Sequence, residues 1–154
     1  MGAPPALYRV EGESNMTGKQ LAAGGIVGAV VLSATGYLLF TMVLGNFYAA
    51  ALSAGSATGV PRESLLTWAV ALGALSYGVL LTLAIGLRGG DSTVGTGIKT
   101  GAIVGFLVWF TADFMLYGIS NVLNLTGALV DPLLEVVPSA ITGAAIAVVL
   151  RKVR

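Results

Sequence analysis

Four long apolar stretches constrain the fold of this chain more than any other feature. An α-helix needs about 20 apolar residues to cross the hydrocarbon core of a bilayer. The stretches cover residues 21–45, 65–87, 100–123 and 133–150. Only 10% of the residues are charged and the mean hydropathy is +0.90, whereas soluble domains carry about 25% charged residues. The sequence therefore predicts an all-α polytopic membrane protein, with a four-helix transmembrane domain at residues 21–154 behind a polar tail at residues 1–20.

The basic residues are distributed unevenly between the two sides of a four-span arrangement. Only Arg62 falls on one side. The other side carries Arg9, Lys19, Arg88, Lys99, Arg151, Lys152 and Arg154. Because loops rich in Lys and Arg stay in the cytoplasm, both termini are predicted to be cytoplasmic. An odd number of spans would scatter these charges over both sides. We expect a multi-pass protein of a prokaryotic inner (plasma) membrane.

The connections between the stretches predict how neighbouring helices pair. Residues 46–64 are rich in Gly, Ala and Ser. In the turn at residues 88–99, the candidate caps for the third helix are Asp91, Ser92 and Thr93. The last connection, residues 125–130, is short and ends in Asp131-Pro132, which suits an N-cap followed by a first turn. The third and fourth helices are therefore predicted to form a hairpin that turns near Ala128.

Small residues at four-residue spacing indicate where helices touch. Helices in lipid associate through close packing, so glycines mark their contact faces. The predicted packing positions are Gly24, Gly28, Gly97, Gly101, Gly105 and Gly143. Two interpretations are open: internal packing of a tight bundle, or a face that binds other membrane subunits or a second copy of the chain.

A polar stripe on the third helix surrounds an intramembrane acid, Asp113. Tyr117, Ser120 and Asn121 lie on or beside its face. In the predicted hairpin, Glu135 is level with Asn121, and Asp113 lies roughly 12 Å deeper at about 1.5 Å per residue. The two acids are thus expected not to touch, and Glu135 is expected to lie near the membrane edge. Asp113 either takes up a proton or cation, or fixes helix orientation through a hydrogen bond.

The C-terminal third of the chain resembles small bacterial four-helix membrane families. The resemblance is carried by GAIVGFLVWFTADFMLYGISNVLN, a short turn, and DPLLEVVPSAITGAAIAVVL. In those families a glycine-rich helix with aromatic residues and an acid precedes a last helix of small residues. The resemblance implies four spans, and it implies no activity because those families have none assigned.

Composition narrows the classes of function. The chain contains no histidine and no cysteine, so no cofactor is expected and His-ligated haem and thiolate metal sites are excluded. A net charge of +1 gives no basic surface for nucleic acid. Without a reactive constellation the protein is not predicted to be an enzyme. We predict a non-catalytic accessory or structural subunit that packs with other membrane subunits or itself in the lipid bilayer. The alternative is a small proton- or cation-coupled transporter or channel that uses Asp113.

Overall fold

A computed structural model describes residues 16–46, 64–88 and 92–153, and every structural statement below concerns these residues. The elements are α1 (Gly18–Gly36), the π-helix η1 (Tyr37–Val43) that continues it, α3 (Thr67–Gly86), α4 (Val94–Ile119) and α5 (Leu125–Lys152). The described part contains no β-strand. Its four spans, counting α1 and η1 as one, are each long and apolar enough to cross a membrane. The prediction of an all-α protein with four membrane-length helices is confirmed, and it indicates a multi-pass membrane protein.

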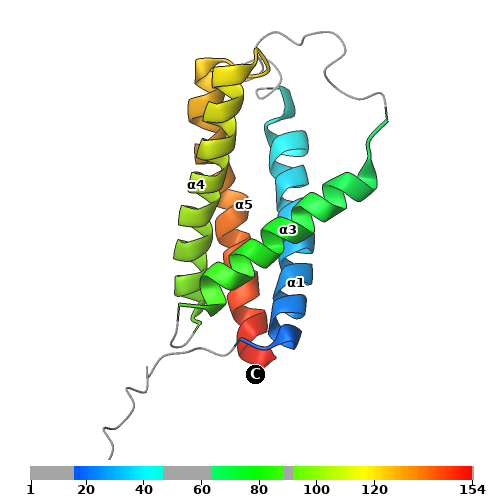
Figure 1. Ribbon diagram of the computed structural model, residues 1–154, viewed down its shortest axis with the longest axis vertical. Helices are drawn as coiled ribbons and strands as arrows, with labels where there is room; N and C mark the ends of the chain where they lie inside the picture. Colours follow the sequence, from blue (N-terminus) through cyan, green and yellow to red (C-terminus); the bar gives the residue numbers. More distant parts are fainter. Residues whose placement is uncertain (1–15, 47–63, 89–91, 154) are drawn as a thin grey trace, which may run out of the picture.

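The helices form a bundle in which one pair is much closer than the others. Helices α4 and α5 lie antiparallel along their whole length, and α1 packs against α3 and α5 (Figure 1). Helix α3 crosses the bundle obliquely, so its first half leads away from α4 and α5 (Figure 1).

The two ends of the described chain meet at one end of the bundle. A side chain added at Gly86, the last residue of α3, would meet the sulfur of Met16 and the side chain of Leu150. The same end carries all the basic residues that the structure describes (Figure 1): Lys19, Arg88, Lys99, Arg151 and Lys152. Arg88 donates a hydrogen bond of 2.8 Å to the hydroxyl of Thr100, which joins the end of α3 to α4. We call this the basic end; Arg9, Arg62 and Arg154 lie outside the described residues.

We expect the basic end to face the cytoplasm, because basic loops resist translocation. Alkaline phosphatase needs disulfides and therefore works only outside the cytoplasm. Fused after the C-terminus it should be inactive, and fused after Asn46 it should be active. Fusions of a green fluorescent protein provide the reciprocal control. Phosphatase activity at the C-terminus together with none after Asn46 would reverse the orientation.

Side-chain caps explain where three of the helices begin. Thr17 accepts from the backbone of Gln20 at the start of α1. Thr93, one of the three candidate caps for α4, accepts from the backbone of Thr96. At the start of α5 the Oδ1 atom of Asn124 accepts from the backbone of Gly127 at 2.7 Å. Each cap satisfies an amide that the first helical turn leaves without a partner.

The last helix begins about two turns earlier than predicted, and this corrects the interpretation of Asp131-Pro132. Because Asn124 caps α5, Asp131 and Pro132 are buried inside the helix instead of starting it. Proline is tolerated inside membrane helices, where neighbouring helices satisfy the backbone groups it frees. The hairpin turns at residues 120–124 and not near Ala128. When a hairpin turn moves by one residue, the residue that faces a given position on the other helix changes by two. The whole register of α4 against α5 therefore differs from the prediction.

The six predicted packing glycines are all buried, and they lie where helices approach closely. A Cβ at Gly97 would collide with the backbone of Gly143, and one at Gly101 with the carbonyl of Ser139. On the other side of α5, a Cβ at Gly28 would lie 2.8 Å from the Cα of Gly78 on α3. The glycines thus allow backbones to approach without an intervening side chain.

A small apolar core fills the half of the bundle toward the basic end. Its buried members are Leu81, Ile85, Ile146, Ala147 and Leu150, with Tyr77 and Val104 packed against it. These residues come from the second half of α3, the last turns of α5 and the middle of α4. The polar residues described next lie in the other half.

Candidate functional site

Three carboxyl groups come together on α4 and α5, and we call them the acid cluster. Asp113 is 3% exposed, Asp131 is 4% exposed and Glu135 is 8% exposed. The carboxyl groups of Asp113 and Asp131 are close enough to share a hydrogen bond, and Glu135 interacts electrostatically with both. The predicted register is wrong: Gly143 lies against Gly97 and Gly101, so the earlier turn places Asp113 opposite Asp131, one turn from Glu135, and not opposite Gly143. Glu135 is also in the third turn of α5, not at its beginning.

The acid cluster has no basic partner among the described residues. Lys99, on the same helix as Asp113, is about four turns away toward the basic end, at 3.6 residues per turn. The Oδ2 atom of Asp113 is buried and has no hydrogen-bond partner in the described residues. An ionised carboxylate can only accept a hydrogen bond. Two carboxyl groups therefore share a hydrogen bond only when one of them carries a proton. The arrangement of Asp113 and Asp131 therefore has a place for a proton.

The other predicted site residues do not join the acid cluster. Tyr117 is 42% exposed near the end of α4. Ser120 follows that helix and donates to the backbone carbonyl of Leu116 at 2.7 Å. Asn121 is exposed in the turn. The sequence analysis interpreted Asp131 as a helix cap and did not include it in the site, although Asp131, Glu135 and Ser139 follow one another at four-residue steps on one helix face.

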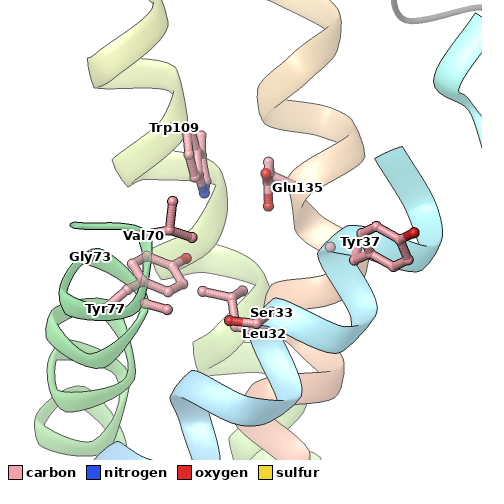
Figure 2. Close-up of a pocket in the computed structure, with 10 residues that line it drawn as sticks. Leu32, Ser33, Tyr37, Val70, Gly73, Tyr77, Trp109 and Glu135 are labelled. Carbon is pink, nitrogen blue, oxygen red and sulfur yellow. The ribbon is translucent and has the colours of Figure 1, made fainter. Parts of the chain in front are cut away.

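A cavity of about 450 Å³ lies between the helices beside the acid cluster. Its walls come from α1, η1, α3, α4 and α5: Leu32, Ser33, Gly36, Tyr37, Val70, Gly73, Ala74, Tyr77, Trp109 and Glu135. Figure 2 shows Trp109 and Glu135 on neighbouring helices at one side of this space, with Tyr77 and Leu32 at the other. Glu135 is the only member of the acid cluster that lines it.

Few polar groups reach the cavity, and most of them have no hydrogen-bond partner among the described residues. No hydrogen bond to the Glu135 side chain occurs in the part of the chain that the structure describes. The indole Nε1 of Trp109 is buried without an acceptor among the same residues. The hydroxyl of Tyr77, in contrast, shares a hydrogen bond of 2.9 Å with that of Ser139. A Cβ at Gly105 would crowd this pair, so that glycine makes room for it.

Two glycines leave the cavity wall open. At Gly36 on α1 and Gly73 on α3, no described atom outside the glycine's own stretch of helix lies within 4 Å of the position that a Cβ would occupy. Both differ from the packing glycines, because at those positions the backbone or a side chain of a neighbouring helix occupies the space that a Cβ would need. The volume of the cavity therefore depends on these two positions having no side chain.

In the described ranges no group of three or more acidic side chains has the arrangement to hold a metal ion. No protein-family model matches the chain, and no curated protein or solved structure matches it significantly. The functional conclusion therefore depends on the chemistry of the acid cluster and the cavity, and the resemblance of the C-terminal third stays a prediction.

Proposed function

We propose that this protein is a small proton- or cation-coupled membrane transporter or channel, and that the acid cluster binds the transported or coupling ion. The observation that carries the proposal is the burial of three carboxyl groups at membrane depth without a basic partner in the described residues. One of them, Glu135, opens onto a cavity. Of the two functions predicted from the sequence, we therefore favour the transporter or channel over the accessory subunit.

Energetics support an ion-binding role over a purely structural one. A carboxylate at the bilayer centre costs about 2.5–3.5 kcal/mol on insertion scales. Neutral groups can orient helices at lower cost, as the hydroxyls of Tyr77 and Ser139 do between α3 and α5. Three acids in one place are useful when they exchange protons or cations, since each added positive charge offsets their mutual repulsion.

The positions of the three acids suggest the order in which an ion moves. Glu135 lines the cavity, so an ion or proton arriving there meets it first. Asp131 lies one turn earlier on α5, close enough to Asp113 for the two carboxyl groups to share a hydrogen bond when one of them carries a proton. Protons therefore pass from Glu135 to the aspartate pair over neighbouring oxygen atoms. Toward the basic end, Tyr77 and Ser139 are followed by the apolar core, which closes the route in this conformation.

A hydrolytic role for the two aspartates is less well supported. Aspartic hydrolases do hold two carboxyl groups that share one proton. Such a pair must reach its substrate, yet neither Asp113 nor Asp131 lines the cavity. The group that a cavity ligand can touch is Glu135.

The direct test is ion flux in proteoliposomes. We expect the wild-type protein to dissipate a pH gradient, reported by an enclosed pH-sensitive dye, faster than protein-free vesicles. Asp113→Asn and Glu135→Gln should each slow this at least tenfold, because an amide keeps the shape of the carboxyl group and cannot be ionised. Thr111→Val is the matched control: Thr111 is exposed on α4 and bonds only to the backbone of Leu107.

Two results would contradict the proposal. Flux unchanged in both acid variants would remove the acid cluster from the pathway. Wild-type flux equal to that of protein-free vesicles, over both proton and monovalent cation gradients, would return the protein to the accessory-subunit interpretation.

A further inference from the structure

The size and walls of the cavity fit a small organic molecule. Ligand pockets usually enclose about 300–1,000 Å³ and are lined mainly by apolar and aromatic side chains. This one has about 450 Å³, aliphatic walls at Leu32 and Val70, and three aromatic rings, those of Tyr37, Tyr77 and Trp109. An apolar molecule in contact with these walls would be removed from water or lipid over most of its surface.

The polar groups of the cavity select for positive charge. Glu135 is more than nine-tenths buried, has no hydrogen-bond partner in the described residues and faces this space (Figure 2). Its carboxylate is a counter-ion for a cation, and the rings of Tyr37, Tyr77 and Trp109 give an organic cation aromatic walls. Carboxylate and rings together favour a cation over a neutral molecule of the same shape.

Inorganic cations suit this cavity less well. Calcium takes six to eight oxygen ligands and magnesium demands near-ideal octahedral geometry. The cavity wall offers the carboxyl group of Glu135 and hydroxyls from Ser33, Tyr37 and Tyr77, of which that of Tyr77 already pairs with Ser139. An organic cation needs one counter-ion and otherwise apolar contact, which is what the wall supplies.

We infer that the cavity binds a small lipophilic organic monocation of the aromatic ammonium class, with Glu135 as its counter-ion and the aromatic rings of the wall around its apolar part. That such a cation is then moved across the membrane rests on the proposed function. Binding itself does not, so the two can be tested separately. Glu135 would then be the point at which cation and proton compete for the same oxygen atoms.

The binding test uses benzyltrimethylammonium and the protein in detergent. The chain has two tryptophans, and Trp68 is exposed at the start of α3. Trp68→Phe therefore leaves Trp109 as the sole fluorescent reporter inside the cavity. We expect a saturable change in Trp109 fluorescence, confirmed by equilibrium dialysis. Neopentylbenzene, in which carbon replaces the charged nitrogen, should bind at least tenfold more weakly.

Two variants locate the site. Glu135→Gln should weaken binding of benzyltrimethylammonium at least tenfold. Gly73→Leu should weaken it similarly by filling the cavity, since its side chain has open space to enter. Gly118→Leu on α4 is the matched control, because Gly118 also has nothing within 4 Å and is not part of the cavity wall. It should leave binding unchanged and the melting temperature unchanged or slightly raised.

The outcomes separate this inference from the proposed function. No saturable binding, equal binding of the neutral isostere, or equal loss of affinity in Gly73→Leu and Gly118→Leu would each overturn the inference. Saturable binding without any flux in vesicles would support the binding site and contradict transport. Proton flux that requires Asp113 and Glu135, in a protein that does not bind benzyltrimethylammonium, would support transport and contradict the organic cation.

Discussion

Gly101→Leu should prevent α4 and α5 from packing and leave little folded protein after extraction into detergent. A Cβ at Gly101 would overlap the carbonyl oxygen of Ser139 and lie 3.2 Å from the Cα of Gly143. Both are backbone atoms of α5, so the clash is relieved only when the helices separate. Overpacking in a well-packed interior costs about 1–3 kcal/mol and occasionally more. Because backbone opposes backbone here, we expect a loss at or above the upper value.

Gly101→Ala and Gly118→Leu provide the comparison for this prediction. Alanine places only a methyl group against Ser139, so Gly101→Ala should be destabilised less than Gly101→Leu. Gly118 lies on the same helix with open space around it, and leucine there should be neutral or slightly stabilising, since glycine is a poor helix former. Size-exclusion profiles and thermal unfolding followed by circular dichroism measure the effect. Equal stability of Gly101→Leu and Gly118→Leu would contradict the close approach.

The second large effect concerns the register of the hairpin. Asp113→Cys combined with Asp131→Cys should be cross-linked by dibromobimane, which fluoresces only after it joins two thiols. Asp113→Cys combined with Gly143→Cys should not. The chain has no cysteine of its own, so every fluorescent product comes from the introduced pair. The result is close to all-or-none because the two registers differ by about three helical turns.

Single-cysteine variants at each position are the controls for reaction between separate molecules. Cross-linking of positions 113 and 143 but not of 113 and 131 would restore the hairpin predicted from sequence. It would also separate the acids, and the acid cluster with both proposals would then fail.

The fold was largely predictable because lipid restricts it so strongly. A span of about 20 apolar residues has few alternatives to a helix, which is why the four spans were found from hydropathy alone. The glycines at positions 97, 101 and 105 likewise indicated one face of the third span. The start of the last span was not found, because Asp131-Pro132 has the chemistry of a helix start while the tolerance of proline in membrane helices makes that signal ambiguous. Asn124, which caps α5, was available as a signal and was not used.

The site was less predictable than the fold because it depends on register between two helices. Asp113 could be singled out from its surroundings in one helix. Its partner Asp131 could be identified only from the position of the turn. Placing the turn six residues too late moves the residue that faces Asp113 by twelve, from Asp131 to Gly143. The cavity was beyond sequence reasoning altogether, since the oblique course of α3 that contributes to it follows from packing contacts of Gly25, Gly28 and Gly78.

The apolar core between the acid cluster and the basic end has an electrical consequence. A layer of apolar side chains (Leu81, Ile85, Ile146 and Leu150) has a low dielectric constant, so a transmembrane voltage falls steeply across it. One elementary charge that crosses the full potential gains or loses about 2.3 kcal/mol per 100 mV. A cation that leaves Glu135 through this layer would experience much of that energy, and the resting polarity of the cell would then set the direction of net movement.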